Sequence, residues 1–244
     1  MLTMIQSLAF TLYEKIEKLR FFENDLFDSL FVKFYNLYKK FEAISPDRLK
    51  EFIPEGCTVI DVGGGMGFYS RAFSDFVSPK GQVICFEPED RNYRRIKKIR
   101  FPNQNIVIER IACSDFTGKI GFRVDAKNPA NHSIDSISEV LVDCLRIDEY
   151  SMFENRVAFI KIDVQGHELE VLLGASKILV QDFPAVLVEF DNRESNKKSI
   201  QILSFMKKMK YFPSILVDGT FKVVEKTDDV LMLRSYFDVL FLPK

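Results

Sequence analysis

The sequence predicts an α/β fold in which helices cover both faces of a mostly parallel sheet, preceded by a helical extension. Short apolar runs rich in β-branched residues alternate with segments of helical periodicity, which is typical of a sheet buried on both faces. The first run ends in a cluster of glycines, as strands that lead into a ligand-binding turn do. The length of 244 residues suits one such domain plus an extension.

Residues 1–54 have the periodicity of amphipathic helices, with apolar side chains every three or four residues and charges of both signs on the opposite face. Such helices are marginal in isolation, so their apolar face must be buried. We expect it to pack against the rest of the chain or, as a second choice, to form a homodimer. Pro54 and Gly56 then interrupt the pattern, and we place the α/β domain at residues 55–244.

Within the domain, strands are predicted where apolar and β-branched residues run together, over residues 58–62, 82–86, 105–108, 158–162, 185–190 and 237–242. Helices are predicted where the apolar period lengthens, over residues 89–100, 168–180 and 199–208. A turn at residues 115–118 favours a hairpin strand over residues 119–124.

Composition narrows the class of protein. With 47% hydrophobic and 28% charged residues, the chain reads as an ordinary globular protein. The net charge of -1 gives no overall basic field, so we expect no nucleic-acid partner. The four cysteines form no Cys-x-x-Cys pair, which favours reduced thiols in a cytoplasmic protein without a zinc site. The apolar N-terminus is too short for a membrane span and lacks the marks of a signal peptide.

A glycine-rich segment follows the first predicted strand. Asp61 leads into Gly63, Gly65 and Gly67, which stand at alternate positions before Phe68. These glycines let the backbone turn tightly and approach a ligand without an intervening Cβ. The dinucleotide motif G-x-G-x-x-G would need glycine where Phe68 stands, which argues against a nicotinamide-dependent oxidoreductase. A purely structural tight turn is the alternative.

The second predicted strand ends in an acid, Glu87. It lies about 20 residues past the glycines, the separation at which an acid meets the ribose diol of a nucleotide cofactor. A solvated glutamate at a strand end is the alternative. Together, the glycines and this acid predict a site for a nucleotide-containing cofactor.

Polar residues also follow the fourth predicted strand. Asp163 closes that strand, so it should point into the same crevice, and His167 and Glu168 open the next helix. Two acids and an imidazole would then meet near the reactive end of a bound cofactor. Alternatively, Asp163 caps a turn, Glu168 complements the helix dipole and His167 is a surface residue.

These motifs resemble the FkbM-type methyltransferases, a family of S-adenosylmethionine-dependent enzymes with a Rossmann-like fold. The resemblance is carried by residues 59–63, 67–69, 86–88, 159–168, 171–175 and 184–189. It covers roughly residues 55–242 and leaves the extension outside. Two positions depart from the usual pattern, which has Ala-Asn where Gly64-Gly65 stand and Glu where Gln165 stands.

The resemblance implies transfer of a methyl group from S-adenosylmethionine to a hydroxyl of a sugar, glycolipid or related small molecule. It assigns the cofactor to Asp61, Gly63, Gly65, Gly67, Phe68, Glu87 and Asp115. Because a hydroxyl is a poor nucleophile, a base must take its proton. Asp163 is the first candidate, His167 the second and Glu189, at the end of the fifth predicted strand, the third. We favour no metal, although Asp163 and Glu189 could share a divalent ion.

The acceptor is expected under the irregular segment 126–138, because long loops in compact domains are often lids. Asn131, His132 and Glu168 could contact a polar acceptor such as a glycan, and the N-terminal helices would form one wall. A plain surface loop is the alternative. The non-enzymatic alternative is a nucleotide-binding module whose basic residues between Arg91 and Arg100 bind nucleic acid or acidic lipid. Such a run is more often the solvated face of a helix.

Overall fold

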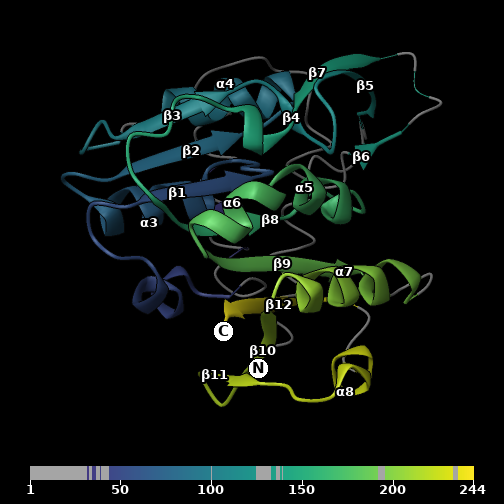
Figure 1. Ribbon diagram of the computed structural model, residues 1–244. Helices are drawn as coiled ribbons and strands as arrows, with labels where there is room; N and C mark the ends of the chain where they lie inside the picture. Colours follow the sequence, from purple (N-terminus) through teal and green to yellow (C-terminus); the bar gives the residue numbers. More distant parts are fainter. Residues whose placement is uncertain are drawn as a thin grey trace, which may run out of the picture.

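The computed structural model describes residues 44–99, 101–124, 133–135, 138, 140–191, 196–232 and 236–244, together with four helical residues of the extension, 32, 35, 36 and 39 (Figure 1). Most of the predicted N-terminal extension therefore lies outside the described residues, as do Asn131 and His132 of the predicted acceptor loop. No helix among the described residues has the length and apolar character needed to cross a membrane.

The main sheet has eight strands in the order β11-β10-β12-β9-β8-β1-β2-β3. Its five parallel strands are β3 (Ile106–Glu109), β2 (Gln82–Phe86), β1 (Thr58–Val62), β8 (Val157–Ile162) and β9 (Ala185–Asp191). At the far edge, β12 (Tyr236–Pro243) runs antiparallel between β9 and β10 (Tyr211–Val217), and β11 (Thr220–Val223) pairs with β10. This arrangement confirms the predicted α/β fold with a mostly parallel sheet.

Apolar residues of the strands alternate between two cores. Ile60 and Ile84 face a core that also contains side chains of α5 (Glu168–Gly174), α6 (Ser176–Gln181) and α7 (Lys197–Lys208). Val59 and Val83 face the opposite core, which is covered by α3 (Phe68–Val77) and by residues next to the short helices η1 (Pro46–Arg48) and η2 (Lys50–Phe52). The remaining helices are α4 (Asp90–Lys98), η3 (Ile147–Glu149) and α8 (Thr227–Leu231). Burial of both faces explains why these strands are almost entirely apolar.

A second sheet of four strands is inserted between β3 and β8. Its order is β4 (Ala112–Cys113), β7 (Leu141–Leu145), β5 (Gly118–Arg123) and β6 (Ser133–Ile134). Figure 1 shows it near the end toward which β1 and β2 point. The predicted hairpin strand at residues 119–124 is β5, which pairs with both β6 and β7.

The predicted helical stretch over residues 168–180 is confirmed but divided, because the chain breaks at Ala175 into α5 and α6. A Cβ on Gly174 would lie 2.0 Å from the Ser114 carbonyl oxygen, so the end of α5 packs directly on the second sheet. Asp148 in η3, whose side chain is fully buried, accepts hydrogen bonds from the Lys177 and Ile178 amides at the start of α6. The carboxylate therefore caps α6 from outside and lets it begin where it does.

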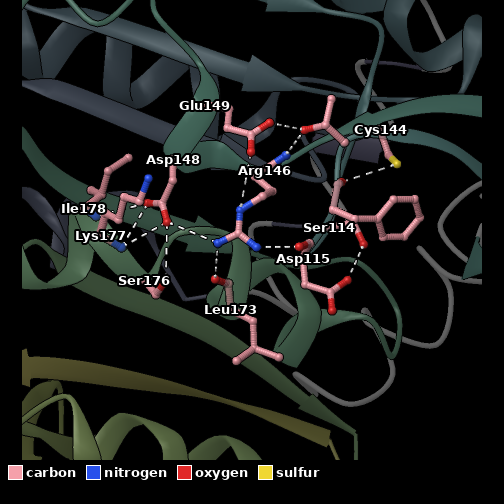
Figure 2. A network of polar contacts seen from close by, with 12 residues as sticks. Ser114, Asp115, Cys144, Arg146, Asp148, Glu149, Leu173, Ser176, Lys177 and Ile178 are labelled. Atoms are coloured by element: carbon pink, nitrogen blue, oxygen red, sulfur yellow. Dashed lines mark hydrogen bonds and ion pairs between the residues drawn. The ribbon is translucent and has the colours of Figure 1, made fainter.

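Arg146 ties these elements together (Figure 2). Its guanidinium donates to the backbone carbonyls of Asp115, after β4, and Leu173, in α5. The same group forms ion pairs with Asp148 at 3.5 Å and Glu149 at 3.8 Å. One side chain thus joins the second sheet to the helix that follows β8.

Candidate active site

The glycine loop lies where the strand order of the main sheet reverses, between β1 and β8. Gly63, Gly65 and Gly67 have φ values of +75°, +56° and +77°, a region that favours glycine. The Gly63 amide donates to the Phe86 carbonyl at 2.9 Å, which holds the loop against β2. A Cβ on Gly63 would lie only 1.9 Å from the Asp163 carbonyl oxygen, so the segments after β1 and β8 are in direct contact. Ligands of open α/β sheets bind at such a reversal.

Gly64 departs from the alanine usual in the resembling family, and its surroundings give a reason. A Cβ there would lie 2.2 Å from the Cys85 sulfur, which is fully buried in β2. The Cys85 side chain therefore fills the space that an alanine methyl would need.

Glu87 follows β2 and binds the glycine loop. Its Oε2 accepts from the Gly65 amide at 2.7 Å and its Oε1 from the Glu89 amide at 2.9 Å. Burial raises the pKa of this carboxyl to about 8, although the two backbone donors partly oppose the shift. Each carboxylate oxygen keeps a second lone pair, so the group can still accept from a ribose diol.

The surroundings of Gly65 are sparse among the described residues. A Cβ on Gly65 would meet, among the described residues, only the Tyr35 hydroxyl, at 3.4 Å. A side chain at this position would therefore meet little of the described chain. Phe68 begins α3 directly after the loop and packs edge-on against Tyr69, with ring centroids 5.2 Å apart.

Asp61 points into the protein, toward a buried lysine. Its Oδ2 accepts from the Ser70 hydroxyl at 2.5 Å, and its Oδ1 lies 3.5 Å from Lys161 Nζ. The same ammonium lies 3.4 Å from Asp163 Oδ2 and donates to the Gly63 carbonyl at 3.3 Å. Lys161 was not among the predicted site residues, although a single charge in an apolar strand is a signal that could have found it.

Asp163 and Glu189 form an acid pair at the ends of adjacent strands. The Gln165 amide nitrogen lies 3.4 Å from Asp163 Oδ1 and donates to Glu189 Oε2 at 3.1 Å. Burial alone would raise the pKa of Asp163, but Lys161, Lys39 and a hydrogen bond with Glu189 lower it to about 2. Burial and the Asp163 charge raise the pKa of Glu189 well above its usual range. Asp163 therefore carries the negative charge and Glu189 the proton.

His167 lies apart from this pair. Its Nε2 is 3.0 Å from the Ser114 hydroxyl and its Nδ1 is 3.5 Å from Glu170 Oε2. Burial lowers the pKa of the imidazole, which favours its neutral form. Both ring nitrogens thus face groups at the junction of α5 and the second sheet.

Glu168 and Asp115 are the remaining site residues that were predicted from the sequence and that the structure describes. The Glu168 carboxylate is buried and accepts from the Gly166 amide at 2.8 Å, and burial raises its pKa. Asp115 is exposed and its Oδ1 accepts from the Ser114 hydroxyl at 3.2 Å. Among the described residues, no group of three or more His, Cys, Asp or Glu side chains has the geometry to hold a metal ion.

The described residues of the N-terminal extension lie against the site. Tyr35 is buried in a cluster with Val32, Met66 and Phe68, beside the glycine loop. Lys39 is close enough to the acid pair to lower the pKa of both Asp163 and Glu189 in part. One helical segment therefore reaches both the glycine loop and the acids.

Comparison with known proteins places this site in a family. The model of the methyltransferase FkbM domain matches residues 61–213. The 2-O-methyltransferase NoeI of Sinorhizobium fredii (strain NBRC 101917 / NGR234) is 28% identical over 148 residues, which cover 50% of this chain and 59% of that protein, so the match spans less than two thirds of its length.

Two solved structures are more distant. A methyltransferase FkbM from Methylobacillus flagellatus KT is 14% identical with a TM-score of 0.49, over 96% of this chain and 58% of that one. A SAM-dependent methyltransferase from Aquifex aeolicus is 16% identical with a TM-score of 0.46, over 87% of this chain and 97% of that one. The family match spans the glycine loop, Glu87 and the acid pair, and it confirms the expected methyltransferase domain with S-adenosylmethionine as its cofactor. This chain belongs to the FkbM methyltransferase domain family.

Proposed function

We propose that this protein is an S-adenosylmethionine-dependent O-methyltransferase that acts on a hydroxyl of a sugar, glycolipid or related small molecule. The observation that carries the proposal is the meeting of two features at one sheet reversal. Glu87, bound to the Gly65 amide at 2.7 Å, lies on one side. The acid pair lies on the other, joined to the glycine loop through the contact of Gly63 with Asp163. The name of the relative NoeI, a 2-O-methyltransferase, supports a hydroxyl acceptor.

On the cofactor side, Glu87 would accept the ribose hydroxyls, and the glycine loop would approach the cofactor through backbone atoms. Phe68, directly after the glycine loop, and Asp115, after β4, are the remaining proposed contacts. S-adenosylmethionine, when bound, supplies an electrophilic methyl group on a sulfonium sulfur, which leaves as a neutral thioether.

On the acceptor side, Asp163 is the proposed base. As the new C–O bond forms, the attacking oxygen becomes positively charged and its proton strongly acidic, so a carboxylate of low pKa can accept it. Glu189 holds its own proton and, with Gln165, keeps the Asp163 carboxylate oriented. Orienting the acceptor and base is the main contribution that an enzyme makes to such a displacement. Roles for His167 and Glu168, and for Asn131 and His132 in acceptor binding, stay predictions.

The extension would form one wall of the acceptor site. The approach of Tyr35 to Gly65 and of Lys39 to the acid pair supports packing of this segment against the domain. A homodimer through residues 1–54 and a cytoplasmic location stay predictions, and sedimentation velocity of the full chain would test the first.

The test uses the full chain and methyl-labelled S-adenosylmethionine with a panel of oligosaccharides and glycolipids. We expect label to enter an alkali-stable methyl ether, which separates O-methylation of a hydroxyl from esterification of a carboxyl group. Calorimetry with S-adenosylhomocysteine should show binding without any acceptor. Failure to bind either form of the cofactor would contradict the proposal, and binding of a nicotinamide dinucleotide instead would favour an oxidoreductase.

A further inference from the structure

Lys161 is a charged residue in an otherwise apolar core strand. It lies in β8 directly opposite Asp61 of β1, and its side chain is 6% exposed. Its neighbours Ile160 and Ile162 are buried in the core of the sheet. Burying an ammonium is costly unless it is paired, so a lysine is a poor choice for this position on grounds of packing alone.

The contacts of Lys161 join the two sides of the crevice. One ammonium reaches Asp61 at the end of β1, the Gly63 carbonyl of the glycine loop and Asp163 after β8. Its Nζ also lies 5.1 Å from the centre of the Tyr69 ring, whose face attracts a cation. Without this ammonium, the buried Asp61 and the half-buried Asp163 would lose a shared partner and the Gly63 carbonyl would lose a donor.

The charges around Asp163 show what the ammonium does. Asp163 interacts electrostatically with five titratable groups: Lys161, Lys39, Glu189, Glu168 and Tyr69. Two further acids, Asp61 and Asp238, shift the pKa values of some of these five groups. At Asp163 itself, burial raises the pKa, and the groups that oppose burial are Lys161, Lys39 and a hydrogen bond with Glu189. Lys161 makes the largest of these opposing contributions, and the acids in turn raise the pKa of Lys161.

We propose that Lys161 is a positioning residue for methyl transfer, which keeps the Asp163 carboxylate ionised and holds it in a fixed relation to the glycine loop. That the reaction is methyl transfer rests on the proposed function, whereas the effect of Lys161 on the ionisation of Asp163 does not. Lys161 itself touches neither substrate nor cofactor in this scheme. Its ammonium acts through the carboxylate that takes the proton and through the carbonyl of Gly63.

The test is the titration of Asp163 in the cofactor-free protein, followed by carbon NMR of labelled aspartate and assigned with Asp163→Asn. In Lys161→Met we expect the midpoint to rise by roughly one to three pH units. The acidic limb of the pH profile of turnover should move in the same direction, and affinity for S-adenosylhomocysteine should fall several-fold. The matched control is Lys119→Met, which removes a lysine that pairs with Asp143 where both side chains are exposed, and it should change none of these values.

Lys161→Met leaves the fully buried Asp61 carboxylate without its cation, so the variant could fail to fold, and a second comparison covers that case. In an Asp61→Asn background, Lys161→Met removes the ammonium together with the carboxylate that it also neutralised. Asp163 should still titrate higher in the double variant than in Asp61→Asn alone. An unchanged Asp163 midpoint in either comparison would overturn the proposal, whereas failure of the wild type to bind the cofactor would overturn the proposed function instead.

Discussion

Two cations each anchor a polar network among the described residues, and the balance of their partners differs. Arg146 donates to backbone carbonyls of Asp115 and Leu173, and its partner Asp148 is itself engaged by the amides of α6 (Figure 2). Lys161 instead lies between the side chains of Asp61 and Asp163, with Glu189 close by. Arg146 binds two backbone carbonyls as well as Asp148 and Glu149 and joins elements of the fold, whereas Lys161 has two acids and one carbonyl around a single ammonium.

The difference between the two networks indicates which of them takes part in catalysis. Crowded acids near Lys161 have their pKa values moved in opposite directions, down for Asp163 and up for Glu189. Pairs of groups whose surroundings separate their pKa values are typical of acid and base partners. Substitutions in the Lys161 network should therefore reduce function, and those in the Arg146 network should reduce stability.

The largest effect is expected for Asp163→Asn. An amide keeps the shape of the side chain but cannot accept the proton, so methyl transfer should fall roughly 100- to 10,000-fold. Affinity for S-adenosylhomocysteine should change little, whereas the melting temperature should fall modestly, because Lys161 loses one of its two carboxylate partners. If the variant lost stability but kept its turnover per folded molecule, the Lys161 network would serve stability and not function. The measurement is initial rate beside calorimetry and thermal unfolding.

Glu87→Gln should act next most strongly, on binding. Its amide nitrogen would oppose a backbone N–H, and one acceptor for the ribose hydroxyls would be lost, so affinity for S-adenosylhomocysteine should fall by about 1–3 kcal/mol. Calorimetry measures this directly, and equal affinity would rule out Glu87 as the ribose ligand.

The same variant should change the dependence of stability on pH. The pKa of Glu87 rises from 4.5 to about 8 on folding, so the folded state keeps a proton that the unfolded chain releases in this window. The free energy of unfolding is then lowered as pH rises from 4.5 to 8, by at most about 1.4 kcal/mol per pH unit. Urea titrations at pH 5 and pH 8 should show a smaller loss for Glu87→Gln than for the wild type.

Asp148→Ala tests the other network. Removing the cap of α6 should lower the free energy of unfolding by about 1–2 kcal/mol and leave turnover of the folded protein unchanged. Asp143→Ala, which removes an exposed partner of Lys119, serves as a control and should cost less than about 1 kcal/mol. Loss of activity in Asp148→Ala well below its melting temperature would show that the two networks are not separate.

The smallest effect on turnover is expected for His167→Gln, since both ring nitrogens already face Ser114 and Glu170. We expect a loss below about tenfold, far less than a missing base would cause. Because burial lowers the pKa of His167 below 6.5, its contribution to stability is present at neutral pH and lost as pH falls, and the variant should reduce that loss. A loss of turnover equal to that of Asp163→Asn would make the imidazole the base.

The main sheet could be predicted from the sequence because its strands are buried on both faces. β1 and β2 coincide with the predicted strands at residues 58–62 and 82–86, since their apolar runs have clear ends. The second sheet could not be recognised in full, because Leu141 and Asp143 of β7 are exposed and β4 has only two residues. The break between α5 and α6 also depends on Asp148, a cap that is distant in the sequence.

The site was predictable where a motif marks the end of a strand. Glu87 and Asp163 are such positions, and both face the glycine loop. The contacts of His167 with Ser114 could not be foreseen, because they depend on how the second sheet packs against α5. The partners of Lys161 likewise follow from the register of β1 and β8 and not from any local pattern.

The close approach of Gly63 to Asp163 bears on how this protein can be recombined with its relatives. The Asp163 carbonyl oxygen, after β8, occupies the space that a side chain at Gly63 would need, so the shapes of the two segments depend on each other. A chimaera with a crossover between them would join a loop from one parent to a strand end from another. Exchanges that move residues 61–68 and 161–167 as a block should preserve the fit, and those that separate them should lose cofactor binding before they lose the fold.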